Sequence, residues 1–134
     1  MAEINLLNTY PSINRDVEGR FKLITDKHHK IARQFGKEFF DGDRLVGYGG
    51  YKYDGRWVSV VERFRDYYGL ALESSVLDVG CAKGFMLHDF MQVIPGIKVA
   101  GIDISRYAID NAMESVKPFV RTANAKELPF PDKS

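Results

Sequence analysis

The sequence has little of what marks several common classes of protein. Its 134 residues include one cysteine, Cys81, so neither an internal disulfide nor a zinc site built on several cysteines can form. No apolar run reaches the roughly 18 residues that a membrane-spanning helix requires. The first residues, MAEINLLNTYPSINRD, have neither the basic start nor the long apolar stretch of a secretory signal. We therefore expect a cytoplasmic protein with no metal centre and no membrane partner.

An excess of charge of one sign is also missing. Nineteen basic and 18 acidic residues give a formal net charge of +1, which favours no nucleic-acid backbone as a partner. In contrast, 45% of the residues are hydrophobic and 28% are charged, as in globular proteins that bury a core. A disordered chain is excluded, because it would lack the apolar residues to bury.

The composition changes near residue 70, which divides the chain into two expected segments. Residues 1–69 are polar and aromatic, with five of the seven tyrosines between Tyr48 and Tyr68. Residues 70–134 alternate short apolar runs with helical patterns. We expect a helical N-terminal segment, residues 1–69, and a sheet-containing domain, residues 70–134.

Three helices are predicted in the N-terminal segment from apolar spacing and capping residues. They cover residues 15–23 after Asn14, 27–40 after Asp26, and 56–68 before Gly69. The second helix would bury one stripe, formed by Ile31, Phe35 and Phe39. Residues 41–55 are too rich in glycine for a helix, which indicates a loop.

The second segment follows the order strand, helix, strand, helix, strand. The strands are expected at residues 75–79, 97–102 and 119–121, the helices at 85–93 and 106–116, and a final loop at 124–134. Ser105 would cap the second of these helices. Such an order predicts the α/β class, with a parallel sheet and right-handed crossovers.

A turn of small residues joins the first of these strands to its helix. It reads Asp78-Val79-Gly80-Cys81-Ala82-Lys83-Gly84, and such a turn lets a ligand approach the backbone and the unpaired N–H groups of the helix start. Asp103 lies 25 residues after Asp78, at the end of the second strand. A carboxylate there can accept hydrogen bonds from both hydroxyls of a ribose. The two features predict an adenosine site at the carboxyl ends of parallel strands.

The spacing of the glycines narrows the choice of adenosine ligand. A dinucleotide usually takes G-x-G-x-x-G, because its pyrophosphate needs a longer glycine cradle. Here Phe85 stands where the third glycine of that pattern would be. The shorter pattern suits a ligand without phosphates, such as S-adenosylmethionine, whose amine and carboxylate can bind backbone groups of both signs.

Three motifs in order resemble those of the class I S-adenosylmethionine-dependent methyltransferases. VLDVGCAKG is similar to the first motif of the family, usually VLDVGCGTG, and GIDIS is similar to the second. NAKELPFPDKS is similar to the segment that passes the adenine ring in the small-molecule branch of the family. The resemblance covers residues 75–134. It implies a Rossmann-like sheet flanked by helices, S-adenosylmethionine as cofactor and a small molecule as methyl acceptor.

By this resemblance, the turn would bind the methionine half of the cofactor. Asp78 would help to hold the amine through water. The other turn residues expected at the cofactor are Gly80, Cys81, Ala82 and Gly84. Ala82 replaces the usual middle glycine, and Lys83 stands where a small polar residue is common.

The resemblance places the nucleoside half of the cofactor on the later motifs. Asp103 would bind the ribose hydroxyls, and Ile104 would pack on the adenine. Asn124 replaces a frequent aspartate, and its carbonyl oxygen can still accept from the adenine amine. The backbone of Ala125 would meet a ring nitrogen, with Leu128 nearby.

The N-terminal segment would form a lid over the cofactor and shape the acceptor pocket, as in many members of the family. Residues 47–57 contain glycines that permit movement, and Tyr48, Tyr51 and Tyr53 could line a cavity. No spacing identifies a catalytic base. The candidates are His28, His29, Asp54 and the tyrosines.

The resemblance also implies strands beyond the third. The family's sheet order is 3-2-1-4-5-7-6, so this chain would encode about half of the sheet and leave one edge of the first strand uncovered. We expect a fragment that carries the cofactor-binding half, or a chain completed by a partner or by a second copy of itself.

Two other classes of function remain open. One is an NAD-type nucleotide-dependent oxidoreductase, which Phe85 and the NAKELPFPD segment argue against. The other is a non-catalytic module that binds the cofactor or assembles with a partner.

Overall fold

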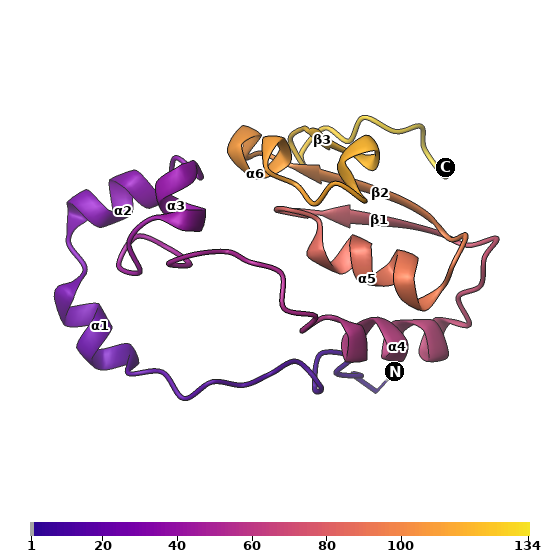
Figure 1. The fold of residues 1–134 in the computed structure, drawn as a ribbon, viewed down its shortest axis with the longest axis horizontal. Helices are drawn as coiled ribbons and strands as arrows, with labels where there is room; N and C mark the ends of the chain where they lie inside the picture. Colours follow the sequence, from indigo (N-terminus) through magenta and orange to yellow (C-terminus); the bar gives the residue numbers. More distant parts are fainter. Residues whose placement is uncertain (1) are drawn as a thin grey trace.

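A three-stranded parallel sheet organises the C-terminal part of the molecule (Figure 1). Residues 2–134 are described by a computed structural model of the chain. The strands are β1 (Ser75–Val79), β2 (Lys98–Asp103) and β3 (Val120–Thr122), in the order β1-β2-β3. Because Val79 lies opposite Ile102, β1 and β2 end at the same edge of the sheet. This register brings the turn after β1 close to Asp103.

The α/β class and the parallel sheet predicted from the sequence are confirmed. β1 and the helix α5 (Phe85–Val93) have the predicted bounds, and β2 and β3 lie one residue later than predicted. The topology is Rossmann-like, since each strand connects to its parallel neighbour through a helical segment.

Two of the helices are layered on one face of the sheet. α5 lies along this face, and α4 (Val58–Tyr68) packs on α5 (Figure 1). Two buried clusters fill these interfaces. They are Cys81, Leu87, Ala112, Val116 and Val120 beside the sheet, and Val61, Phe90, Ile94 and Ile97 between α4 and α5. Fully burying one side chain of this kind stabilises the fold by about 1.5–3 kcal/mol.

The outer edge and the other face of β1 are not covered within residues 2–134. β1 pairs with β2 alone, and Leu77 and Val79 are 40% and 47% exposed. An apolar strand with a bare edge is the arrangement that the sequence predicts for the first strand.

α1 (Val17–Leu23) begins later than predicted. Its N-cap is Asp16, whose Oδ1 accepts a hydrogen bond of 2.8 Å from the N–H of Gly19, so the prediction of Asn14 as cap was wrong. Asp16 is the residue whose side chain reaches the third helical N–H, and this geometry selects the cap.

The single helix predicted over residues 27–40 is in fact two. α2 (Asp26–Ala32) follows Thr25, and α3 (Lys37–Asp41) follows Gly36. Between them Phe35 has a φ of +48°, which lies outside the helical region. The continuous buried stripe was therefore also wrong, because Phe35 is 40% exposed and Phe40 is buried in its place.

Two further helices differ in length from their predictions. α4 begins at Val58, two residues late, and ends as predicted before Gly69, which takes the left-handed conformation with a φ of +61°. α6 (Arg106–Asp110) starts after the Ser105 cap as predicted but ends six residues early. It ends because the N–H of Met113 donates to the carbonyl of Lys83 instead of continuing the helix.

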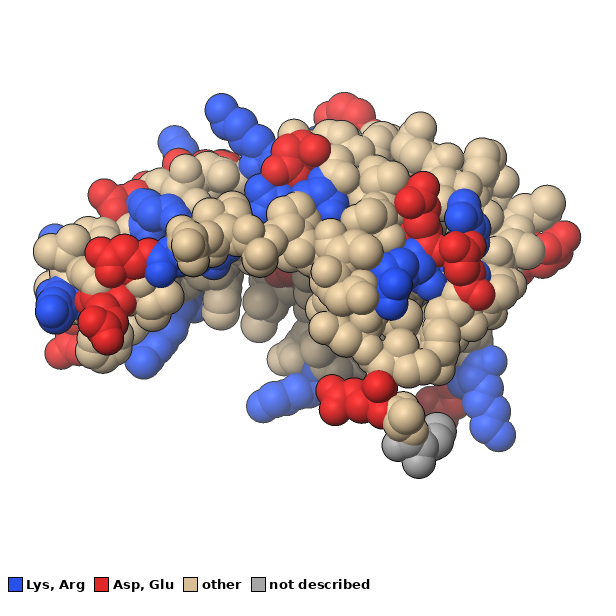
Figure 2. Space-filling view, turned by 90° about the horizontal axis from the view of Figure 1, so that it is seen from below, with Lys and Arg blue, Asp and Glu red and all other residues tan. Residues whose placement is uncertain are grey.

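Charges of both signs are interspersed on the face of the molecule shown in Figure 2. No large area of one sign is visible there, in agreement with the net charge of +1. Within residues 2–134, no helix has the length and apolar character needed to cross a membrane.

Candidate functional site

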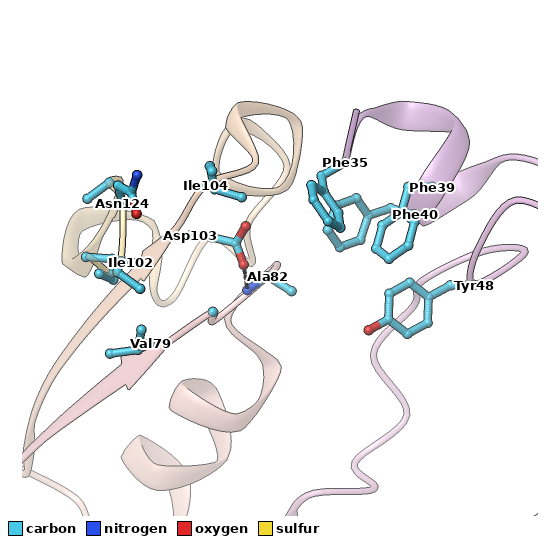
Figure 3. Close-up of a pocket in the computed structure, with 13 residues that line it drawn as sticks. Phe35, Phe39, Phe40, Tyr48, Val79, Ala82, Ile102, Asp103, Ile104 and Asn124 are labelled. Carbon is cyan, nitrogen blue, oxygen red and sulfur yellow. Dashed lines mark hydrogen bonds between the residues drawn. The ribbon is translucent and has the colours of Figure 1, made fainter. Parts of the chain in front are cut away.

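A cavity of about 440 Å³ lies at the carboxyl ends of β1 and β2 (Figure 3). Its lining comes from the sheet edge, the following loops and the N-terminal segment. The lining residues are Phe35, Phe39, Phe40, Tyr48, Val79, Gly80, Ala82, Ile102, Asp103, Ile104, Ala123, Asn124 and Ala125. Six of the ten residues predicted from the sequence to bind the cofactor line this one cavity: Gly80, Ala82, Asp103, Ile104, Asn124 and Ala125.

The turn after β1 uses the left-handed region at three positions. Gly80, Ala82 and Gly84 have φ values of +84°, +50° and +78°. A side chain at Gly80 would meet no protein atom within 4 Å, whereas one at Gly84 would come within 2.4 Å of Val116. The absence of a side chain at Gly80 therefore leaves space for a ligand, and its absence at Gly84 allows Val116 to pack against the turn.

Asp103 fixes the geometry of the site through both carboxylate oxygens. Its Oδ2 accepts a hydrogen bond of 2.8 Å from the N–H of Ala82 (Figure 3), and its Oδ1 accepts one of 2.8 Å from the N–H of Ser105. Each oxygen keeps a further lone pair with which to accept from a ligand. A carboxylate held in this way is suited to bind two neighbouring hydroxyls, as on a ribose.

Most backbone N–H groups of the turn are already bonded within the protein. Those of Gly80 and Cys81 donate to Ile102 O, and that of Gly84 donates to Cys81 O. With the N–H of Ala82 on Asp103, four donors that the sequence suggested for a ligand carboxylate are in use. The turn therefore offers a ligand mainly space and carbonyl oxygens.

The loop after β3 supplies the far wall of the cavity. The Oδ1 of Asn124 accepts a hydrogen bond of 3.0 Å from the N–H of Lys126, which orients the amide. The N–H of Ala125 donates to no other residue among those described. Ile104 is 61% exposed, so its side chain offers an apolar surface to a ring.

Four of the ten predicted residues do not line the cavity. Gly84 contacts the core, and Leu128 is 47% exposed in the final loop. Cys81 is buried, and burial raises the pKa of its thiol to about 12, which makes it unreactive. Asp78 is partly buried on β1. Desolvation, together with the charge of Asp103, raises the pKa of Asp78 to about 6.

Residues 35–53, which we call the docking arm, form a wall of the cavity that the sequence predicted only at Tyr48. Phe35, Phe39, Phe40 and Tyr48 face the sheet edge across the cavity (Figure 3). The hydroxyl of Ser105 donates to the carbonyl of Phe35, which fixes the start of the arm.

The unusual residues of the turn hold the docking arm in place. Ala82 packs in a buried cluster with Phe40 and Ala108. Phe85 stacks on Tyr51, with ring centroids 4.6 Å apart. Ala82 and Phe85, the two residues that replace glycines of the dinucleotide pattern, therefore both contact the docking arm.

Lys83 makes the main polar link to the docking arm. Its Nζ lies 2.7 and 2.9 Å from the carboxylate oxygens of Asp41 and donates to Tyr51 O at 2.9 Å. Tyr107 donates to the same carboxylate at 2.6 Å. Burial alone would raise the pKa of Asp41, but the hydrogen bonds from Lys83, Tyr107 and the Tyr51 N–H lower it to about 2.

Removing this link should release the arm. In Lys83→Met, Asp41 loses its cation while partly buried, so we expect the free energy of unfolding to fall by about 2–4 kcal/mol. Hydrogen exchange should rise across residues 37–51. Exposed Lys98 provides the matched control, and Lys98→Met should change neither quantity. Unchanged exchange in Lys83→Met would show that the arm is held by other contacts.

None of the candidate bases from the sequence is set up to remove a proton in the cavity. His28 caps α2 by accepting from the N–H of Thr25, and Asp54 pairs with Arg56 at 2.6 Å. Tyr48 is the one tyrosine that lines the cavity, and burial raises its pKa. A raised pKa makes the Tyr48 hydroxyl a hydrogen-bond donor rather than a base near neutral pH. Among residues 2–134, no three side chains form a metal-binding group.

Residues 72–130 match the family model of a methyltransferase domain. No curated protein matches the chain. Two solved structures are similar. One, described as the MccD protein, has 26% identity and a TM-score of 0.46, with 52% of this chain and 33% of that chain covered. The other, an S-adenosylmethionine-dependent methyltransferase from Aquifex aeolicus, has 22% identity and a TM-score of 0.44, with 89% and 53% covered. The chain therefore spans between a third and about half of the length of these proteins.

Proposed function

We propose that the chain binds S-adenosylmethionine in the 440 Å³ cavity for methyl transfer to a small molecule, because residues 72–130 match the family model of a methyltransferase domain and the site motifs resemble those of the class I S-adenosylmethionine-dependent methyltransferases. The observation that carries the proposal is the placement of Asp103 beside the open face of Gly80. A carboxylate that can accept from ribose hydroxyls and a glycine that leaves space for a ligand therefore lie at the carboxyl ends of two neighbouring strands. This is the place at which open parallel sheets bind nucleosides.

The residues of the cavity fit the parts of the cofactor. Asp103 would accept from the ribose hydroxyls, and Gly80 would give the methionine half room. Ile104 would cover the adenine, and Asn124 with the Ala125 N–H would bind its polar edge. Asp78 does not line the cavity but lies on β1 directly before its lining residues Val79 and Gly80, and from there its charge would attract the ammonium group.

The cofactor supplies a methyl group already activated on a sulfonium. The chain contributes by alignment and by excluding water, for which the aromatic wall of the docking arm is placed. The aromatic side chains Phe39, Phe40 and Tyr48 also suit a positive charge, worth roughly 0.5–2 kcal/mol per contact.

Calorimetry with two ligands tests the proposal. We expect S-adenosylhomocysteine to bind and NAD to bind at least tenfold more weakly, because Phe85 is committed to Tyr51 where a dinucleotide needs a glycine. Tighter binding of NAD would favour an oxidoreductase. Binding of neither ligand by folded protein would favour a module that only assembles with a partner.

The remaining proposals concern the setting of the protein. We place it in the cytoplasm, with residues 1–69 as the lid segment and residues 70–134 as the cofactor domain. The bare edge of β1 would pair with a further strand, from a longer chain or from a second copy. Molecular mass in solution, by light scattering, distinguishes a monomer from a self-association.

Cofactor affinity should depend on pH through Asp78. With a pKa of about 6, its carboxylate is lost below pH 6, and its attraction for an ammonium group is lost with it. We expect the dissociation constant of S-adenosylhomocysteine to rise as the pH falls from 7 to 5, and Asp78→Asn to remove most of this dependence. Asp132→Asn, in the exposed final loop, is the control.

The charged Asp78 carboxylate, which should favour cofactor binding, should lower the stability of the fold. The folded pKa of Asp78 lies above the ordinary value of 3.8, so its deprotonation destabilises the fold as the pH rises from about 4 to about 6. Asp78→Asn should therefore raise the free energy of unfolding at pH 7 by roughly 1–3 kcal/mol while weakening cofactor binding. A variant that loses stability and keeps its affinity would place Asp78 outside the site.

A further inference from the structure

A second cavity adjoins the cofactor cavity. Its volume is about 920 Å³, within or close to the range of about 300–1,000 Å³ that is usual for small-molecule sites. It lies between the N-terminal residues, α1 and the loop that leads to α4. Phe39 and Tyr48 line both cavities, so these two aromatic side chains form a wall that the cavities share.

Arginine side chains gather on the wall of this cavity without carboxylate partners. Arg20 Nη2 and Arg44 Nη1 both donate to Gly47 O, at 3.3 and 2.5 Å, so the two guanidinium groups meet at one carbonyl. Arg15 lines the same cavity. Among residues 2–134, none of the three lies within 4 Å of a carboxylate oxygen, and the Nε of Arg20 is buried without a hydrogen bond.

The positive charge of these arginines is not neutralised by the neighbouring side chains that the structure describes. Asp16, the one carboxylate in the lining, caps α1 through the N–H of Gly19. Arg56 is neutralised by Asp54 at 2.6 Å. Burial and the neighbouring charges of Arg20 and Arg15 lower the pKa of Arg44. Like charges held together in this way are stabilised when an anion binds between them.

The carbonyl that gathers the arginines is rigidly placed. A side chain at Gly47 would come within 2.0 Å of Phe39 O, so this segment lies directly against α3. The N–H of Tyr48 donates to the same Phe39 O at 2.8 Å. The arginine pair is therefore anchored to the docking arm that separates the two cavities.

Much of the remaining lining is aromatic. Tyr10 packs on Trp57 with ring centroids 4.7 Å apart, and Tyr51 with Phe85 forms a second pair of rings. Arg56 donates to the hydroxyl of Tyr10 at 3.2 Å and so positions this ring. Aromatic side chains of this kind bind flat apolar groups, and the nearby guanidinium groups can bind an oxyanion of the same ligand.

We propose that the second cavity holds the methyl acceptor, and that the acceptor is a small molecule that joins an oxyanion, carboxylate or phosphate, to a flat apolar body, with Arg20 and Arg44 binding the oxyanion. This inference rests on the proposed methyl transfer for the role of the ligand. The binding site itself rests on the arginine and aromatic lining alone.

The position of the only tryptophan provides the assay. Trp57 lines the second cavity, so its fluorescence reports on binding there. The protein, saturated with S-adenosylhomocysteine, is titrated with phenylacetate, phenyl phosphate and the neutral phenylacetamide. We expect at least one of the two anions to bind at least tenfold more tightly than the amide, and the tighter of the two identifies the oxyanion.

Arginine variants test the assignment of residues. Arg20→Met and Arg44→Met should each weaken anion binding at least fivefold and leave phenylacetamide unchanged, whereas Arg44→Lys should retain more affinity than Arg44→Met. Arg106→Met, on the exposed surface of α6, is the matched control. An amide that binds as well as the anions, or arginine variants that bind like the wild type, would overturn the inference.

Calorimetry on the same samples separates the two proposals. If S-adenosylhomocysteine binds and neither anion gives a saturable change in Trp57 fluorescence, the acceptor inference fails and the proposed function stands. If the anions bind and S-adenosylhomocysteine does not, the anion site stands and the proposed function fails.

Discussion

Gly80→Val is expected to abolish binding of S-adenosylhomocysteine, by at least a hundredfold. The residue has a φ of +84°, and its missing side chain would point into space with no protein atom within 4 Å. A valine would therefore place its two methyl groups in the cavity rather than against the core. It would also strain the turn, because a β-branched residue is disfavoured in the left-handed region by about 1–2 kcal/mol.

A second variant separates occlusion from strain. Gly80→Ala carries most of the backbone strain but adds one methyl group, so we expect it to lose part of the stability and to retain measurable affinity. Calorimetry gives the affinity, and thermal unfolding shows that both variants fold. If folded Gly80→Val binds S-adenosylhomocysteine within threefold of the wild type, the turn does not contact the cofactor.

Asp103→Ala should have the next largest effect, a loss of about 1.5–3 kcal/mol in cofactor binding, or roughly 10- to 150-fold. The carboxylate accepts from the Ala82 and Ser105 N–H groups and has lone pairs left for the two ribose hydroxyls. Its removal therefore costs the ligand bonds and also loosens the turn.

The ligand can be varied to distinguish these two losses. A 2′,3′-dideoxy analogue of S-adenosylhomocysteine lacks both hydroxyls, so the affinity that wild-type protein loses for it measures the ribose contact alone, and any greater loss in Asp103→Ala measures the loosened turn. Asp103→Ala should bind the two ligands equally well, because it lacks the carboxylate that the ribose hydroxyls would contact. The difference between the two proteins in this preference is the interaction energy of the contact. Full discrimination by the variant would place the ribose elsewhere.

The part of the fold that the sequence predicted well is the part built from local signals. The bounds of β1 and α5 follow from an apolar β-branched run and from the stop at Pro95-Gly96. Asp103 was placed correctly at the end of β2 because the apolar run that forms the strand directly precedes it. Both depend on residues close together in the chain.

The N-terminal segment was predicted less well because distant contacts decide it. The helix expected over residues 27–40 breaks at Phe35, whose carbonyl accepts from Ser105, 70 residues away. Gly36, directly after Phe35, was a local sign of the break, but the spacing of Ile31, Phe35 and Phe39 favoured one continuous helix. The helix expected to reach residue 116 stops at Asp110 for a similar reason, since Met113 bonds to Lys83.

Of the cavity wall formed by Phe39 and Tyr48, the sequence predicted Tyr48 but missed Phe39, although the turn after β1 contains a sign of the whole wall. Ala82, Lys83 and Phe85 depart from the expected pattern of the turn, and each contacts the docking arm. An unusual residue in an otherwise regular motif indicates a neighbour that the motif alone does not describe. The identity of that neighbour required the structure.

A crystal structure with S-adenosylhomocysteine tests the account most directly. We expect both ribose hydroxyls on the carboxylate of Asp103, the methionine half along the open face of Gly80, and the adenine between Ile104 and Asn124. A ligand that lies outside this cavity, or a cavity closed by the side chains of Phe39 and Tyr48 while the ligand binds elsewhere, would contradict it.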